Sequence, residues 1–422
     1  MQRSENLVSS IDWLTILLYF LIVLLGWLNI YAAIYDEGTT GSIFDFSLNS
    51  GRQLVWIGAS VIITIFILII DFKFYSTFAY FIYGAVFVVL LGVLGFGTEI
   101  AGSKSWIRLG SFGVQPSEFM KFAAALAVAK FMDSHGVKFN NFKDLFILGA
   151  FIALPMGLIV LQGDTGTALI FGAFILVFYR EGLSPLFLIF VAASAAIFLL
   201  ALLVTQSYLA IGIGAAAFLI ILLSKKNLKT ITGILLGAAI VFSLIRSVDY
   251  VFTNVLKPHQ QNRIKALINP EEDPLGYGWN VTQSKIAIGS GGMWGKGFLE
   301  GTQTKFDFVP EQSTDFIFCT IGEEHGWFGT LILITLFMLL FLRIVYISER
   351  QKTRFARVYG YSVVAILFFH FAINIGMTIG LFPVIGIPLP FFSYGGSSLW
   401  AFTCLLFVLI KLDAHRMDQL VH

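Results

Sequence analysis

The amino-acid sequence predicts an all-α, polytopic integral membrane protein. Of its 422 residues, 57% are hydrophobic and only 12% are charged, whereas soluble domains carry about 25% charged residues. Apolar runs of roughly 20 residues, the length that crosses the hydrocarbon core of a bilayer, recur along the chain. Basic residues gather in alternate connections between these runs. A water-soluble protein is therefore excluded, and we expect about 12 transmembrane helices, both termini in the cytoplasm and one large extracytoplasmic loop.

The predicted spans are the apolar runs that are long enough to cross the membrane. They lie at residues 13–35, 53–70, 76–97, 117–133, 142–161, 166–180, 184–204, 208–224, 229–247, 327–347, 358–379 and 396–412. The first run is too long for the hydrophobic part of a secretory signal, and no small-residue cleavage site follows it. We therefore interpret it as a retained span.

Basic residues fix the predicted orientation, because short cytoplasmic loops retain Lys and Arg. With the N-terminus inside, the cytoplasmic connections hold Arg3, Lys73, Lys130, Lys138, Lys143, Arg180, Lys225, Lys226, Lys229, Arg343, Arg350, Lys352, Arg354, Arg357, Lys411 and Arg416. The outer ends of the spans hold Arg52, Lys104, Arg108, Lys121 and Arg246. The loop at 248–315, which is too long for the rule, then lies outside, as do 97–116, 161–165 and 382–398.

Charge and cysteine content exclude two other classes of function. A net charge of +2, from 27 Lys and Arg against 25 Asp and Glu, gives no basic excess for a nucleic-acid partner. Cys319 and Cys404 lie far apart in apolar surroundings, which indicates small buried hydrophobic residues and not a disulfide or a zinc site.

The segment 102–121 carries opposite charges just inside an apolar span. Pro116 suits the first turn of a helix, and Glu118 and Lys121 are three residues apart on one helix face. Charges inside a membrane are costly and face a cavity or each other. A structural ion pair and a substrate-facing pair are equally compatible with this spacing.

Two arginines and a tryptophan near the predicted outer face have two interpretations. Trp106 and Arg108, and Arg52 at the entrance of the second span, are typical of interfacial anchors. As a binding site, the indole would cover a sugar or lipid, and the guanidinium groups would hold phosphate.

Two aspartates occur in local turn patterns. Asp164, in QGDTGTA, is favoured as the N-cap of the sixth span, the alternative being a carboxylate that faces a polar cavity. Asp273, in DPLG, fits the first position of a type I turn.

Two further segments have unusual backbone. The glycines around Lys296 do not form a phosphate loop, because Ser290 and Gly297 stand where that motif needs other residues. These glycines indicate tight turns or close approach. The prolines and glycines of 382–400 break a helix at membrane depth, which is tolerated within protein or beside a cavity.

These residues alone predict a polar, outward-facing site without naming its reaction, and a transporter remains a competitor. The motifs GSKSWIRLG with QPSEFMKF, QGDTGTA, NPEEDPLGYGWNVTQSKIAIGSGGMWGKGFLEGTQ, VPEQSTDFIF, IGEEHG and PLPFFSYGGSS resemble, in order, the signature blocks of the SEDS family (shape, elongation, division and sporulation). The match covers the chain apart from residues 180–269. Gly301, Thr302 and Gln303 resemble the elongation branch, RodA, more than the division branch, FtsW.

The resemblance implies a peptidoglycan glycosyltransferase of the bacterial cell inner membrane. Such an enzyme polymerises lipid II into a nascent glycan strand at the periplasmic face during elongation and the maintenance of cell shape. It implies that Asp273 is the catalytic acidic residue. The substrate-binding residues that it implies are Arg52, Trp106, Arg108, Glu118, Lys121 and Asp164. Expected partners are a class B penicillin-binding protein and other membrane proteins of the elongation complex.

A divalent cation such as Mg²⁺ or Mn²⁺ is a candidate cofactor of this reaction, held by carboxylates such as Asp273 or Glu118. The alternative function is a transporter or flippase of lipid-linked precursors, and a non-catalytic scaffold is a third class.

The sequence also departs from the family pattern. Gly163 and Thr165 flank Asp164 where the family commonly has Pro and Leu, and Ser313 stands where His is frequent. We expect one membrane domain over 1–422, with two helices more than the family's usual ten, within 184–247.

Overall fold

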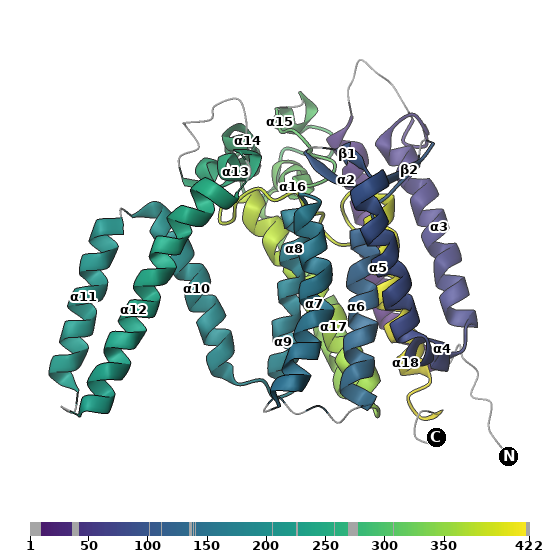
Figure 1. The fold of residues 1–422 in the computed structure, drawn as a ribbon. Helices are drawn as coiled ribbons and strands as arrows, with labels where there is room; N and C mark the ends of the chain where they lie inside the picture. The colour runs from purple at the N-terminus through teal and green to yellow at the C-terminus, as the bar shows by residue number, and fades with distance from the viewer. Residues whose placement is uncertain are drawn as a thin grey trace. The chain divides into compact units, whose positions relative to one another are not determined.

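The computed structural model describes residues 10–35, 42–100, 102–110, 112–134, 137, 139, 141–204, 206–224, 227–256, 258–268, 277–306 and 308–418. Asp273 and the predicted cytoplasmic residues Arg3, Lys138, Lys225 and Lys226 lie outside these ranges. The chain divides into two compact units, one formed by Met1–Gly182 with Trp279–His422 and the other by Leu183–Gly278. Both are built from helices (Figure 1).

The larger unit contains most of the predicted spans. Its helices are α2 (Trp13–Ala33), α3 (Asn49–Ile69), α4 (Phe72–Thr77), α5 (Ala79–Phe96), α6 (Pro116–Ser134), α7 (Phe142–Leu161), α8 (Thr165–Ile170), η1 (Phe171–Ala173), α9 (Phe174–Arg180), α14 (Tyr277–Ser290), α15 (Thr302–Lys305), α16 (Ile317–Glu349), α17 (Arg354–Thr378) and α18 (Gly396–Ala414). The smaller unit contains α10 (Pro185–Leu203), α11 (Gln206–Leu223), α12 (Leu228–Tyr250), the π-helical turn η2 (Val251–Val255) and α13 (Pro258–Ile268).

All of the predicted spans fall on helices. Among the described residues, eight helices are long and apolar enough to cross a membrane: α2, α3, α5, α7, α12 with its π-helical extension, α16, α17 and α18. Helix α6 is not among them, and it carries Glu118 and Lys121. The apolar helices at Thr165–Arg180, Pro185–Phe198 and Ser207–Leu223 are shorter. The fold is that of a polytopic membrane protein.

The connection that precedes α6 is ordered as a small antiparallel sheet. Strands β1 (Thr98–Ile100), β2 (Ser103–Leu109) and β3 (Phe112–Val114) pair in the order β1-β2-β3. The long loop at 248–315 likewise contains α13, α14 and α15. These elements add short regular structure to the predicted connections and leave the fold class helical.

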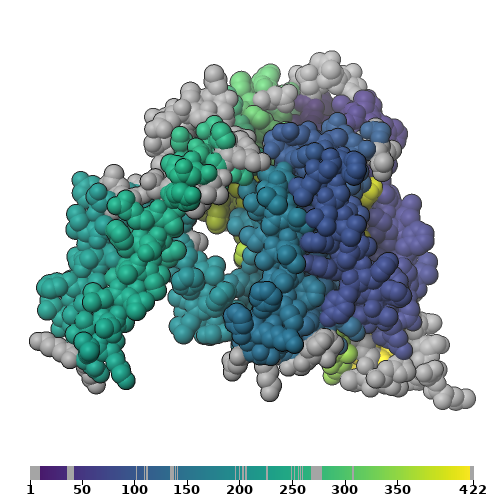
Figure 2. All heavy atoms as spheres, viewed as in Figure 1, coloured from purple at the N-terminus to yellow at the C-terminus, as the bar shows by residue number. Residues whose placement is uncertain are grey.

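Helix α6 runs through the interior of the larger unit. Its small residues Ala123, Ala124 and Ala127 are fully buried, and α6 packs against α5 and α17. Small side chains allow helix backbones to approach closely within a membrane. The neighbouring helices α5 and α7 pack against each other through Tyr83 and Phe151, whose ring centroids are 5.2 Å apart. Figure 2 shows the blue and teal segments of this unit packed side by side.

Ion pairs join several of the helix ends that the charge pattern assigns to the cytoplasm. Asp12, the N-cap of α2, accepts hydrogen bonds from Arg343 at 2.6 Å and Arg350 at 3.1 Å. Arg350 also pairs with Asp413 near the end of α18. These contacts gather the start of α2 and the ends of α16 and α18 at one end of the unit.

A second cluster surrounds Glu181, which follows α9. Its carboxylate pairs with Arg357 at 2.9 Å and Arg354 at 3.1 Å. Burial raises the pKa of Glu181, but the hydrogen bonds and charges of the two arginines outweigh burial and hold the pKa below its ordinary value. The cluster therefore ties α9 to the start of α17 with an ionised carboxylate.

Candidate active site

The buried ion pair of α6 is the centre of the candidate site. Pro116 begins the helix, which places Glu118 in its first turn and Lys121 one turn further on. Lys121 Nζ donates to Glu118 Oε2 at 2.8 Å, and the two residues are 0% and 2% exposed. A charge buried to this degree needs a partner, because its desolvation is costly.

The structure adds His370, from α17, to this pair. Lys121 Nζ lies 2.6 Å from His370 Nε2, and His370 Nδ1 lies 3.3 Å from the carbonyl oxygen of Pro388. An ammonium group only donates, so we assign Nε2 as the acceptor and Nδ1–H as the donor to Pro388. The ammonium also lies 5.1 Å from the ring centroid of Phe402 in α18, within cation–π range.

Sequence reasoning missed His370 because a single histidine in an apolar span has no local pattern. Its partner Lys121 is 249 residues away. The signal that could have found it is the cost of a polar side chain inside the predicted span 358–379.

Asp164 acts as an N-cap and also joins α8 to α6. One carboxylate oxygen accepts the backbone N–H of Thr167 at 3.0 Å, and the other accepts Gln115 Nε2 at 2.7 Å. The backbone N–H of Gln115 donates to Ser397 Oγ at 3.2 Å. The starts of α6, α8 and α18 therefore meet at one place, directly before the Glu118–Lys121 pair.

The other predicted binding residues lie around this meeting point without touching the pair. Trp106, in β2, is half-buried, and a Cβ added to Gly113 of β3 would lie 3.1 Å from its ring. Arg108 and Arg52 are exposed, and Arg52 Nε donates to the carbonyl oxygen of Phe46 at 3.2 Å. Among the described residues, neither arginine forms an ion pair with Glu118.

The start of α3, next to Arg52, is nevertheless fixed to the same region. Gln53 is buried, and its side-chain oxygen accepts the backbone N–H of Gly395 at 3.2 Å, directly before α18. Asp273 lies outside the described residues, between the end of α13 and the start of α14. The structure therefore gives no position for the predicted catalytic carboxylate.

A second buried carboxylate, Glu323 of α16, holds the glycine-rich segment together. It accepts Lys296 Nζ at 2.6 Å, the backbone N–H groups of Thr302 and Gln303 at 2.8 Å, and that of Thr304 at 3.0 Å. Lys296 therefore neutralises a carboxylate, which supports the rejection of a phosphate loop.

The glycines of this segment approach α16 closely, as predicted. A Cβ on Gly291 would lie 2.0 Å from the carbonyl oxygen of Gly322, and one on Gly295 would lie 2.0 Å from that of Glu324. Gly326 itself has φ +62° and kinks α16. Side chains other than hydrogen cannot be accommodated at these contacts without moving the backbone.

The broken segment 382–398 is held from several sides. Asn374 of α17 donates to the carbonyl oxygens of Asp315 at 2.8 Å and Ile387 at 2.7 Å. Ser393 Oγ donates to the carbonyl oxygen of Thr314 at 2.7 Å. Irregular backbone is thus satisfied by protein groups, as its depth requires.

The described carboxylates near the pair do not fit a resident divalent cation. One oxygen of Glu118 already accepts from an ammonium, and both oxygens of Asp164 accept from nitrogen donors. No group of three or more His, Cys, Asp or Glu within the described ranges is arranged to hold a metal ion.

Comparison with known proteins gives one family. A profile of the family described as "Cell cycle protein", comprising FtsW, RodA and SpoVE, matches residues 12–211 and 187–418. Peptidoglycan glycosyltransferase RodA of Treponema pallidum is 34% identical, over 97% of this chain and 99% of that protein. Peptidoglycan glycosyltransferase MrdB of Escherichia coli K12 is 32% identical, over 94% of this chain and 93% of its own length.

The fold also has a solved counterpart. A chain of a peptidoglycan synthase complex, described for its coordination of polymerization and crosslinking, aligns with a TM-score of 0.68 at 24% identity. The alignment covers 96% of this chain and 98% of the other.

Proposed function

Since the chain belongs to the SEDS family of FtsW, RodA and SpoVE, it is a peptidoglycan glycosyltransferase, and we propose that it polymerises lipid II into glycan strands during cell elongation. The observation that carries this proposal is the end-to-end similarity to RodA of Treponema pallidum. The substrate fits the architecture, because a lipid-linked sugar can keep its tail in the bilayer while its head reaches a polar site between helix ends.

We further propose that the site faces the periplasm and that the membrane is the bacterial inner membrane. The support is the distribution of basic residues. Arg343, Arg350 and Arg416 lie with Asp12 and Asp413 at one end of the larger unit, whereas the candidate site is formed by the opposite ends of α6 and α18. Short loops rich in Lys and Arg remain cytoplasmic.

The proposed reaction is a single displacement. The 4-hydroxyl oxygen of one sugar attacks the anomeric carbon of the growing chain, the bond from that carbon to the lipid pyrophosphate breaks, and Asp273 takes the hydroxyl proton. An α-linked donor gives a β-linked product in this way, so the configuration inverts, and one general base suffices.

The departing pyrophosphate needs positive charge. Arg52 and Arg108 are exposed, so each guanidinium group can donate hydrogen bonds to a phosphate oxygen without breaking a buried ion pair. Lys121 cannot move without stranding Glu118. We propose that the arginines contact the pyrophosphate, while the buried ion pair fixes the start of α6 beneath it. The proposed reaction includes no step on a metal ion.

The test is polymerisation of lipid II by purified protein in detergent, followed by gel separation of the glycan product. Asp273→Asn should lower the rate by about 10²-fold or more, the range for loss of a general base. Asp45→Asn, which changes an exposed aspartate in the connection before α3, is the matched control. Near wild-type polymerisation by Asp273→Asn would refute the assignment.

The same assay separates the alternative functions. A flippase needs two compartments and a scaffold needs its partner, so neither makes polymer alone in detergent. A parallel arm with a chelator tests the cation requirement.

We also propose a class B penicillin-binding protein as the crosslinking partner, with other membrane proteins of the elongation complex around it. The support is the similarity of fold to a chain from a complex that joins polymerization to crosslinking. The test is co-purification of this chain with the class B protein from a bacterial membrane. Co-purification with a class A penicillin-binding protein is the comparison.

A further inference from the structure

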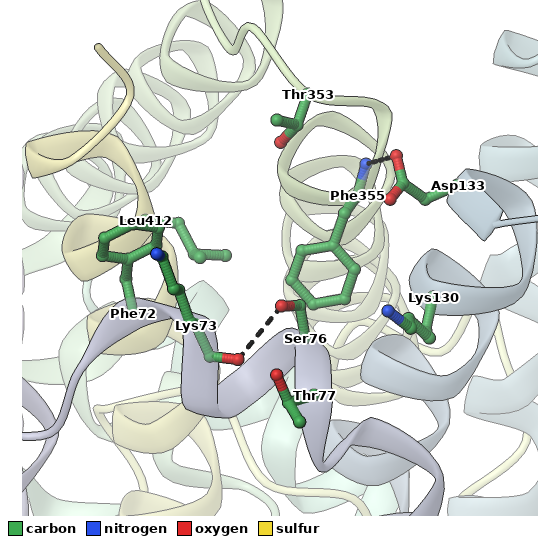
Figure 3. Close-up of a pocket in the computed structure, with 9 residues that line it drawn as sticks. All are labelled: Phe72, Lys73, Ser76, Thr77, Lys130, Asp133, Thr353, Phe355 and Leu412. Carbon is green, nitrogen blue, oxygen red and sulfur yellow. Dashed lines mark hydrogen bonds between the residues drawn. The ribbon is translucent and has the colours of Figure 1, made fainter. Parts of the chain in front are cut away.

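A pocket of about 280 Å³ opens at the end of the larger unit that the charge pattern assigns to the cytoplasm (Figure 3). Four helices and one connection line it: α4, the last turns of α6, the start of α17 with the preceding Thr353, and the end of α18. It is far from the candidate active site along α6, since Lys130 follows Lys121 by nine residues and thus by about 14 Å of helix.

The rim of this pocket is basic and rich in hydroxyl groups. Lys73 comes from α4 and Lys130 from α6, so the two ammonium groups belong to different walls (Figure 3). Thr77 and Thr353 add hydroxyl groups, as does Ser76, whose Oγ donates to the carbonyl oxygen of Lys73 at 3.1 Å. Ammonium groups with neighbouring hydroxyl groups are the kinds of partner that phosphate oxygens accept hydrogen bonds from.

One carboxylate, that of Asp133, also lines the pocket. It accepts the backbone N–H of Phe355 at 3.1 Å, in the first turn of α17. Two lysines against one anchored aspartate leave the lining with a net positive charge. The remaining lining residues, Phe72, Phe355 and Leu412, are apolar.

The surroundings indicate that the phosphate belongs to a lipid. Phe74, in α4, and Phe78, directly after α4, are 37% and 44% exposed. A segment that carries both a lysine and exposed Phe rings is typical of the membrane interface, so we place α4 at the depth of the head groups. A soluble phosphate would not need these exposed apolar rings near the pocket.

We propose that this pocket binds the phosphate head group of an anionic phospholipid of the cytoplasmic leaflet. Basic pockets between transmembrane helices on the cytoplasmic side bind such head groups. The lipid phosphate bridges Lys73 and Lys130 and so ties α4 to α6, while an acyl chain lies along the exposed rings of Phe74 and Phe78. The bound lipid stabilises the packing of α4, α6 and α17.

The experiment is thermal unfolding of the purified full chain in detergent, titrated with phosphatidylglycerol. Phosphatidylglycerol should raise the unfolding temperature, whereas phosphatidylcholine with the same acyl chains should not. Lys73→Gln with Lys130→Gln should raise the lipid concentration at half-maximal effect by roughly 30-fold, since each lysine near anionic lipid contributes a factor of about five. Native mass spectrometry should show less retained phosphatidylglycerol.

The matched control removes two other exposed lysines of the predicted cytoplasmic side, by Lys143→Gln with Lys229→Gln. This control should respond to phosphatidylglycerol as the wild type does. Lys73→Arg with Lys130→Arg, which keeps both charges, should also retain the response. If the double Gln variant fails to fold, the single change at the exposed Lys73 serves, with an expected shift of about fivefold.

Three results would overturn the proposal. The pocket variant could respond like its control, phosphatidylcholine could give the same rise, or inorganic phosphate at equal concentration could reproduce the full effect. The last outcome would identify a soluble anion site and not a lipid site.

Discussion

The buried Glu118–Lys121 pair gives the sharpest test of the site. A purely structural role and a functional role predict different polymerisation rates for the variant in which both residues are replaced. Glu118→Gln leaves an ammonium at a position that is fully buried, and Lys121→Met leaves a carboxylate that is 2% exposed. Breaking a buried pair from one side costs about 3–5 kcal/mol, whereas removing both charges is often close to neutral. The double variant should therefore regain most of the stability that each single variant loses.

The unfolding free energy and the rate of lipid II polymerisation should be measured on the same preparations in detergent. We expect the double variant to fold like the wild type and yet to lose polymerisation, because no ion pair then holds the start of α6 in place beneath the pyrophosphate. A control is Arg180→Gln, which breaks the pair with Glu349, where both side chains are nearly half exposed. Exposed pairs contribute about 0–1 kcal/mol.

Two results would refute this reasoning. A double variant that polymerises at the wild-type rate would show that the pair is structural only. Single variants as stable as the Arg180→Gln control would show that burial does not impose the expected cost on these charges.

Contacts of His370, Glu323 and Glu181 outside the ion pair can be tested in the same way. His370→Ala should lower the turnover rate of polymerisation, with partial rescue by His370→Gln, because glutamine can still accept from Lys121; equal loss in both variants would count against a positioning role. Glu323→Gln should speed hydrogen exchange at the backbone amides of residues 302–304, which lose a charged acceptor, and unchanged exchange would contradict this. The pKa of Glu181 is lower in the folded protein than its ordinary value of 4.5. Its ionised carboxylate therefore stabilises the fold above pH 4.5, and this stability is lost as the pH falls through the lower folded pKa. The unfolding temperature should fall more steeply in acid for the wild type than for Glu181→Gln, and parallel profiles would exclude this contribution.

The helices were predictable because a membrane span needs length and apolarity, which are both local properties of the chain. The strands at 98–114 were not predicted, since β1 and β3 have only three residues each and alternation cannot be recognised over so few positions. Helices α13 and α14, within 248–315, have 11 and 14 residues. They were not predicted because they are shorter than the roughly 20 apolar residues by which the spans were recognised.

Site residues were predictable where a charge interrupts an apolar run. Contacts between residues that are far apart in the sequence were not predictable. Glu118 and Lys121 stand out because few charges occur inside apolar runs, and their spacing predicts contact. Asp164 was identified as an N-cap from its own turn, but its second contact comes from Gln115, 49 residues earlier. Glu323 shows the same limit, since its role depends on a segment about 20 residues away that folds back onto α16.

Helix α6 connects the two proposed binding regions, so a variant in the lipid pocket can also change the activity. Lys121 serves the active-site end and Lys130 the lipid pocket, and the alanines between them are buried. A lipid that ties α4 to α6 stabilises the same helix that positions the Glu118–Lys121 pair, because a helix transmits restraint along its hydrogen-bonded axis. A change at Lys130 can thus lower activity by loosening α6. The lipid titration identifies that case, since excess phosphatidylglycerol restores a weakened lipid site but cannot restore a missing charge at Lys121.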